Sequence, residues 1–294
     1  MLKSFINYLK FEKRFSKNTL ISYQNDLTQF HNYLIEQYSI EKMSDVTHFM
    51  IRSWIVSMIR NGMQPKSVNR KLSSVRKYFL FLKRENIIDS NPALKVVAPK
   101  IGKRLPSIIR QNEIRTLLDE IMTVEGYAEC RNKLLVNLLY TTGMRESELI
   151  GLKDQDINYH SKILKVTGKG NKQRLIPLTD EILTEIQEYI DMRNKHFEKN
   201  TFEYLILTDK GNKLYPKFVY NIVVKNLSMV SSSVKRSPHI LRHSIATHLS
   251  DENVEINALK ALLGHASLSS TQIYTHNSIE KLKNAYVKAH PKAN

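Results

Sequence analysis

An interruption of the apolar pattern between Asp89 and Pro106 constrains the fold of this 294-residue chain more than any other feature. Pro92, Pro99 and Gly102 break helical or strand periodicity there, as in a domain linker. A single core seldom grows beyond about 250–300 residues, and typical domains hold about 100–150. We therefore expect a domain at residues 1–98, a linker at 99–106 and a second domain at 107–294.

The first domain is predicted to be helical, because its apolar residues recur every three or four positions. One helix is expected at 18–38, one at 47–61 ending at Asn61-Gly62, and one beginning at Pro65, where proline fits a first helical turn. The third helix should bury one face and carry its charges elsewhere; the predicted buried residues are Val68, Leu72, Val75, Phe79 and Leu82.

The second domain is predicted to combine helices with a small sheet. The expected helices are at 111–122, 130–141, 146–152, 180–199, 241–251, 256–263, about 269–274, and 278–288. Two β-prone runs, 163–166 and 174–178, flank a polar Gly-Lys-Gly segment and predict a hairpin with Lys169 at its tip. A further strand is expected at 204–208. The expected fold class is thus mainly α with a small β-sheet.

The charge of the chain indicates a polyanionic partner. Lys and Arg total 45 against 28 Asp and Glu, a formal charge of +17. Residues 1–98 hold 16 basic and 7 acidic side chains, and the remainder holds 29 and 21. Because the excess is spread over both halves, a clamp on this partner is favoured over a basic tail.

The same composition argues against a membrane or secreted protein. No run approaches the roughly 18 apolar residues of a spanning helix, and the first 17 residues lack a signal-peptide core. Cys130 is the single cysteine, which excludes an internal disulfide framework, and a small buried thiol is expected there. A reducing cytoplasm is the expected location.

Phosphoryl chemistry on DNA requires a nucleotide-binding loop, carboxylate-held metals, or a side-chain nucleophile among cations. The chain has no Gly-x4-Gly-Lys-Ser/Thr segment and no acidic cluster with two-metal spacing, so neither a metal nor a cofactor is expected. Cationic, imidazole and phenol groups occur instead in polar, interrupted segments, in the order Arg145, Lys169, His239, Arg242, His265 and Tyr274.

This ordered set resembles the active site of the tyrosine recombinases, the phage-integrase family, and most closely their Xer-like and integrase-like bacterial members. The family pattern is Arg, Lys, His-x-x-Arg, His or Trp, then Tyr, and all six positions are present. The resemblance covers nearly the whole chain: residues before the linker look like the helical, SAM-like core-binding domain, and those after it look like the catalytic domain. One departure is Asn253, where relatives often have glycine; asparagine also tolerates positive φ.

The resemblance implies a site-specific recombinase that cuts and rejoins double-stranded DNA through a 3′-phosphotyrosine at Tyr274. It also implies a homo- or hetero-tetramer on two DNA sites, with a second recombinase or accessory protein as a possible partner. Chromosome dimer resolution and integration or excision of a mobile element both fit. In the family, a terminal helix such as 278–288 docks into a neighbouring subunit; its alternative is packing on its own domain.

Elementary chemistry supports these roles. Two guanidiniums, Arg145 and Arg242, would grip phosphate oxygens and stabilise the charge of the transition state. Lys169 would protonate the departing 5′-oxygen. His239 and His265 would handle the tyrosine proton or the phosphate, in an order that the sequence leaves open. Glu148, three residues after Arg145, is expected to orient that arginine.

Each of these residues also has an ordinary structural interpretation. Tyr274 is one of 14 tyrosines, a lone cation is usually solvated, and a lone histidine is usually structural. His239 and His243 have the spacing of a zinc pair, but the rest of the zinc motif is absent. The basic residues Arg70, Arg76 and Lys77 either contact DNA or form a solvent face, and DNA contact is favoured by the net charge. The rival functions are a type IB topoisomerase and a non-cleaving DNA-binding regulator.

Overall fold

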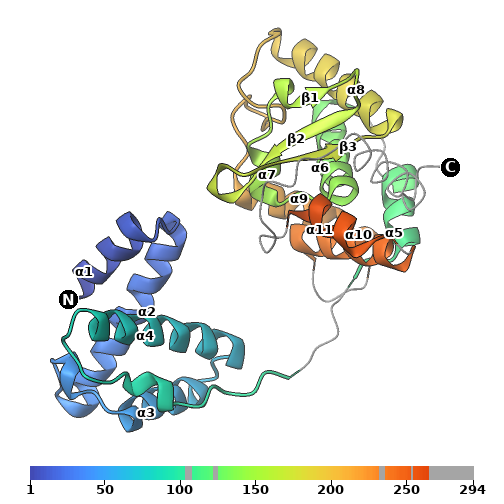
Figure 1. Ribbon diagram of the computed structural model, residues 1–294. Coiled ribbons are helices and arrows are strands. Elements are labelled where there is room, and N and C mark those ends of the chain that lie inside the picture. Colours follow the sequence, from blue (N-terminus) through green and yellow to red (C-terminus); the bar gives the residue numbers. More distant parts are fainter. Residues whose placement is uncertain (103–107, 122–124, 232–235, 253, 265–294) are drawn as a thin grey trace. The chain divides into compact units, whose positions relative to one another are not determined.

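The computed structural model describes residues 1–102, 108–121, 125–231, 236–252 and 254–264 (Figure 1). The chain divides into two compact units, Met1–Arg104 and Leu105–Asn294. In the described ranges, no helix combines the length and the apolar composition that crossing a membrane requires.

The first unit is built from helices around one aromatic and aliphatic core. Its elements are α1 (Leu2–Asn7), a π-helical turn (Tyr8–Glu12), α2 (Lys17–Tyr38), α3 (His48–Arg60), α4 (Pro65–Arg84), and 3-10 turns at Met43–Asp45 and Pro92–Lys95. Phe30 of α2 lies between Trp54 of α3 and Phe79 of α4, with ring centroids 4.9 and 6.3 Å away. The predicted apolar face of α4 is fully buried, which confirms the helical periodicity.

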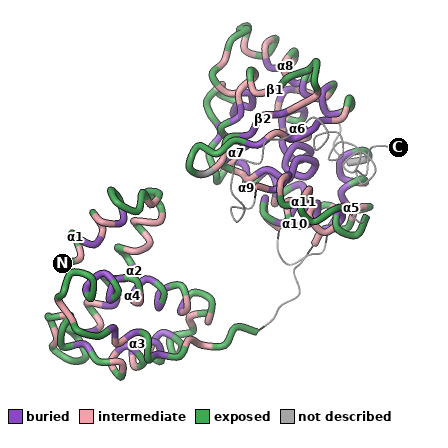
Figure 2. Tube along the Cα trace, viewed as in Figure 1, coloured by how far each residue is buried: buried purple, intermediate pink, exposed green. Residues whose placement is uncertain are grey.

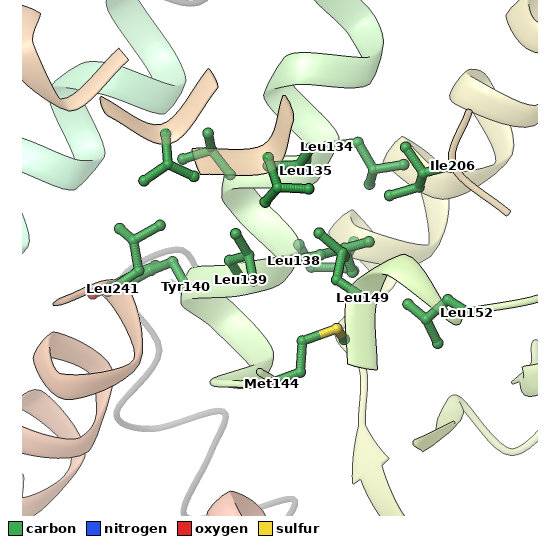
Figure 3. Packing of buried hydrophobic residues seen from close by; sticks show 14 of the residues in the cluster. Leu134, Leu135, Leu138, Leu139, Tyr140, Met144, Leu149, Leu152, Ile206 and Leu241 are labelled. Carbon is green, nitrogen blue, oxygen red and sulfur yellow. The ribbon is translucent and has the colours of Figure 1, made fainter. Parts of the chain in front are cut away.

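The second unit is organised around helix α6. Its elements are α5 (Gln111–Thr116), a π-helical turn (Leu117–Ile121), α6 (Tyr127–Thr142), α7 (Glu146–Ile150), a 3-10 turn (Asp154–Asp156), β1 (Ile157–Asn158), β2 (Ile163–Thr167), β3 (Gln173–Pro177), α8 (Asp180–Phe197), α9 (Pro216–Val230), α10 (Pro238–Asp251) and α11 (Ile256–Leu263). Helix α6 is buried along most of its length and packs against α7, α8, α9 and α10 (Figure 2). Its leucines meet Leu149 and Leu241 in a dense apolar core (Figure 3).

The sheet has three antiparallel strands in the order β1-β2-β3. Strands β2 and β3 form the predicted hairpin, with Val166 opposite Arg174 and Thr167 opposite Gln173. A 3-10 turn, Lys169–Asn171, closes the hairpin, and Gly170 in it has φ 75°. The prediction of this hairpin is confirmed.

In the second unit, one predicted strand is absent from the structure and one helix of the structure was not predicted. The run 204–208 is not a strand: Leu207 makes only an isolated bridge with Lys213, and the amide of Leu205 bonds to the carbonyl of Leu152 in a loop. Its apolar side chains at 205–207 are nevertheless buried, and Leu205 and Ile206 belong to the core of this unit. Helix α9 was not predicted, although Pro216 opens it as Pro65 opens α4. The helices expected at 269–274 and 278–288 lie outside the described residues.

Candidate active site

Arg145 lies at the turn between α6 and α7, and the local sequence fixes this turn. Helix α6 ends at Gly143, which adopts the left-handed conformation (φ 57°) that favours glycine. The amide of Arg145 donates to Glu148 Oε2 at 2.8 Å, capping α7, and its guanidinium Nη1 donates to Glu148 Oε1 at 2.8 Å. One carboxylate therefore caps the helix and binds the guanidinium of Arg145.

Glu148 binds a second arginine that the sequence analysis did not single out. Arg174 of β3 forks the carboxylate, with Nη1 3.0 Å from Oε1 and Nη2 2.8 Å from Oε2. Its Nε donates to the main-chain oxygen of Leu262 at 2.8 Å. The signal in the sequence was strand alternation: Arg174 occupies the same inward face of β3 as Ile176, where a cation requires a buried anion.

Arg242 lies one turn after His239 on α10, so the two side chains leave the same side of the helix. The guanidinium of Arg242 donates through Nη1 to the carbonyl of Gly143 and through Nη2 to the carbonyl of Leu263. His239 is exposed at the first turn of α10. Arg242 thus connects the end of α6 with the end of α11.

Three arginines converge on the carboxyl-terminal end of α11. Arg174 bonds the carbonyl of Leu262, Arg242 that of Leu263, and Arg145 Nη2 that of Gly264 at 3.2 Å. Three guanidiniums thus bind three consecutive main-chain carbonyls. Cations are favourable at a helix C-terminus, where carbonyls lack helical partners.

The electrostatics of the cluster are strongly positive. Burial, then the charges of Arg145 and Arg174, lower the pKa of the Arg242 guanidinium to about 10, so it remains protonated at neutral pH. Burial alone would raise the pKa of the Glu148 carboxyl, but hydrogen bonds from Arg174 and Arg145 outweigh it, and that pKa lies below its ordinary value. Three guanidiniums around one carboxylate leave an excess of positive charge, which suits an anionic phosphate.

The hairpin tip lies against the same carboxylate. A Cβ added to Gly168 would lie 2.9 Å from Glu148 Oε1, so only glycine fits there. Lys169 follows directly and begins the turn at the tip, while its side chain lies outside what the structure describes. His265 follows Gly264 in the sequence. His265, Tyr274 and Asn253 lie outside the described residues.

The basic residues predicted to contact DNA in the first unit all have intramolecular partners. Arg70 forks the buried Asp26 at 2.5 and 2.8 Å and keeps half of its side chain exposed. Arg76 donates to the carbonyls of Ala93 and Val96, and Lys77 lies over the rings of Phe15 and Tyr23. Their contact with DNA stays a prediction, strongest for the exposed Arg70.

Potential metal ligands are dispersed in the part of the chain that the structure describes. No three His, Cys, Asp or Glu side chains in those ranges lie close enough to share an ion. Cys130 is buried, and its desolvation raises the pKa of the thiol to about 11, so it is a poor nucleophile and metal ligand at neutral pH.

The second unit thus combines a mainly helical fold, a small sheet and a cluster of arginines at one helix end that suits an anionic group. Residues 107–281 match the family model described as the phage integrase family, and residues 2–86 match the phage integrase N-terminal SAM-like domain. The chain belongs to the phage integrase family, the tyrosine recombinases.

Its relatives support the same assignment. The chain is 37% identical to tyrosine recombinase XerC of Leptospira interrogans over 99% of this chain and 93% of that protein. It is 33% identical to tyrosine recombinase XerD of Halalkalibacterium halodurans over 99% and 98%. The chain is therefore a site-specific recombinase, an enzyme that recombines DNA.

Solved structures confirm the predicted fold class. The XerH recombinase bound to its palindromic difH substrate aligns with a TM-score of 0.73 at 21% identity, over 97% of this chain and 82% of that chain. A lambda integrase dimer bound to a COC′ core site aligns with a TM-score of 0.68 at 21% identity, over 93% and 96%. The helical amino-terminal domain and the mixed catalytic domain are thus those of tyrosine recombinases.

Proposed function

We propose that this recombinase cleaves one DNA strand at a time by attack of Tyr274 on a phosphodiester, through a site made of Arg145, Lys169, His239, Arg242, His265 and Tyr274. The attack forms a 3′-phosphotyrosine and releases a 5′-hydroxyl. The observation that supports it most directly is the convergence of Arg145 and Arg242 on the end of α11, immediately before His265 in the sequence.

The arginines answer the main energetic difficulty of the reaction. A phenol has a reference pKa near 10, so ionising it at pH 7 costs about 4 kcal/mol. Guanidiniums that bind the non-bridging oxygens stabilise the charge that builds in the transition state. Arg145 retains donors for this purpose, because Glu148 and Gly264 use only part of its fork, and its side chain is 37% exposed.

The remaining groups supply the proton transfers. Lys169, which begins the turn at the hairpin tip directly after Gly168, gives its proton to the departing 5′-oxygen. The imidazoles of His239 and His265 serve the tyrosine proton and the phosphate oxygens. Because the protein–DNA bond conserves the phosphodiester energy, the reverse reaction with a new 5′-hydroxyl rejoins strands without ATP.

Four subunits on two duplex sites would allow the exchange of strands. The dimeric lambda integrase complex on a core site is a solved example of assembly on DNA in this fold. Relatives named XerC and XerD occur together in Halalkalibacterium halodurans, which supports a second recombinase as partner. Chromosome dimer resolution and mobile-element integration or excision are the two biological roles that fit.

Substitution of the nucleophile tests the proposal. We expect wild-type protein, mixed with fragments of its source genome, to form a covalent adduct visible on a denaturing gel, whose attached DNA can be sequenced to identify the site. Tyr274→Phe should abolish the adduct while duplex binding persists. Tyr220→Phe, at an exposed tyrosine of α9, is the matched control and should form adduct normally. An undiminished adduct in Tyr274→Phe would defeat the assignment.

A further inference from the structure

We propose that Arg174 is a positioning residue for strand cleavage, because it holds Glu148, and through it Arg145, together with the end of α11 that leads into His265. This inference rests on the proposed function. Arg174 is not one of the two arginines of the family pattern. It is more deeply buried than Arg145 and binds the same carboxylate.

The donors of Arg174 are directed inward. Its Nη1 and Nη2 are used on the two oxygens of Glu148, and its Nε is used on the carbonyl of Leu262. Its side chain is 8% exposed, against 37% for Arg145. A guanidinium that is this buried, with each of its three nitrogens bonded to a protein group, does not reach a DNA phosphate. Its effect on the reaction therefore passes through the groups that it holds.

Arg174 sets the charge and the geometry of Glu148. Without it, the 2%-exposed carboxylate would have Arg145 as its one remaining guanidinium partner among the described residues. A carboxylate released from one fork attracts the other more strongly, which would draw Arg145 away from the phosphate. Sharing the carboxylate between two arginines leaves the Arg145 fork only partly used.

Arg174 also fixes the end of α11. The left-handed Gly264 (φ 64°) packs on its stem, and a Cβ at Gly264 would lie 3.1 Å from Arg174 Cδ. The bond from Nε to the carbonyl of Leu262 and this contact hold the chain three positions and one position before His265. Lysine keeps the charge at this position but lacks the planar fork, so it cannot make all three bonds.

The test compares cleavage and binding in the full-length chain. The probe is a nicked duplex carrying the site recovered from the wild-type adduct, because the nick traps the covalent product. We expect Arg174→Met to lower the first-order rate of adduct formation at saturating DNA by about 10–100-fold, with the dissociation constant for DNA changed by less than about threefold. The rate of adduct formation by Arg174→Lys should lie between those of the wild type and Arg174→Met.

Arg193→Met is the matched control. Arg193 is a fully buried arginine of the same unit that forks Asp154 at 3.0 and 2.8 Å and donates to the carbonyl of Leu205, in an arrangement much like that of Arg174. Its loss should lower the melting temperature and leave the cleavage rate of the folded protein unchanged. Rates are therefore scaled to the folded fraction from circular dichroism.

A double-variant cycle separates positioning from folding. If Arg174 acts by holding Glu148, Arg174→Met should cost much less cleavage rate in a Glu148→Gln background than in wild type. Equal costs in both backgrounds would overturn the action through Glu148, and wild-type rates in the folded Arg174 variants would overturn the positioning role altogether. Either result would leave the proposed function standing. A wild-type chain that forms no adduct at Tyr274 would overturn both.

Discussion

Glu148 is the anion on which the arrangement of the arginines depends. It accepts from the amide and guanidinium of Arg145 and from both terminal nitrogens of Arg174. A buried carboxylate is tolerated only when its oxygens are saturated in this way. The arginines need it equally, because Arg145, Arg174 and Arg242 would otherwise repel one another around the end of α11.

Replacing Glu148 should destabilise the catalytic unit in a pH-dependent way. At pH 7 we expect Glu148→Gln to lower the free energy of unfolding by about 3–5 kcal/mol, because three clustered cations lose their anion. The pKa of Glu148 is lower in the folded than in the unfolded chain. Its stabilising contribution is therefore present above the unfolded pKa and is lost as the pH falls through the folded pKa.

The measurement is urea unfolding at pH 7 and at successively lower pH, followed by far-UV circular dichroism. The gap between wild type and Glu148→Gln should narrow on acidification. Fluorescence of Trp54, the single tryptophan, reports the first unit and should be unaffected by the substitution. A gap that is constant or widens at low pH would contradict the depressed pKa.

Single residues with chemical signatures could be predicted from sequence more readily than their partners. Glu148 was expected to orient Arg145 because it follows that arginine by only three residues. Arg174 was not predicted, because its partners are a carboxylate 26 positions away and a carbonyl 88 positions away. The bonds from Arg76 to the carbonyls of Ala93 and Val96 were not predicted either, and its contact with DNA stays a prediction. A charge alone does not reveal which carbonyls lie nearby.

At the scale of elements, the end of α6 is held by packing against α10 and α11. Gly143 adopts φ 57°, and a Cβ there would lie 2.8 Å from Leu263 Cδ2 and 3.2 Å from Ile245 Cγ2. The glycine thus satisfies two demands, a left-handed helix cap and a close approach between helices. Its carbonyl also receives the guanidinium of Arg242.

Gly143→Ala should therefore lower the free energy of unfolding by more than the left-handed backbone conformation of this residue alone explains. We expect a loss of about 2–4 kcal/mol, roughly 1 from the left-handed backbone and the rest from overpacking. Gly170→Ala is the matched control, since Gly170 has φ 75° and no atom within 4 Å of an added Cβ. Urea unfolding by circular dichroism should show a loss of only about 1 kcal/mol there. If both substitutions lowered the free energy of unfolding equally, the contact of Gly143 with Leu263 and Ile245 would not be tightly packed.

Long helices with a regular apolar face could be predicted, and short or fully buried elements could not. The faces of α2, α3 and α4 followed from spacing because one side of each meets solvent. The run 204–208 has the composition of a strand, but its apolar side chains reach the core from a loop. Local pattern distinguishes burial from exposure; it does not say whether a sheet or a helix supplies the burial.

At the scale of the whole molecule, we expect the distribution of charge to determine how DNA is held. The excess of basic residues is divided almost equally between residues 1–98 and the remainder, so both parts are expected to contact the duplex. Within the second unit, the arginines on the end of α11 form one focus of positive charge. Phosphate contacts in both parts would release counterions on binding, and the affinity would therefore depend on salt.

The salt dependence of binding measures this arrangement. If about eight phosphates are neutralised, a plot of log K against log salt concentration should have a slope near −7. Tyr274→Phe is the protein to use, because it binds without cleaving under the proposed mechanism. Replacing the exposed Arg70 by glutamine should flatten the slope by about 0.9 if it contacts a phosphate. Arg193→Gln, a buried arginine, should leave the slope unchanged. An affinity of the Tyr274→Phe protein that does not change with salt concentration would contradict the clamp, because a protein that holds duplex DNA through both parts must displace ions from each.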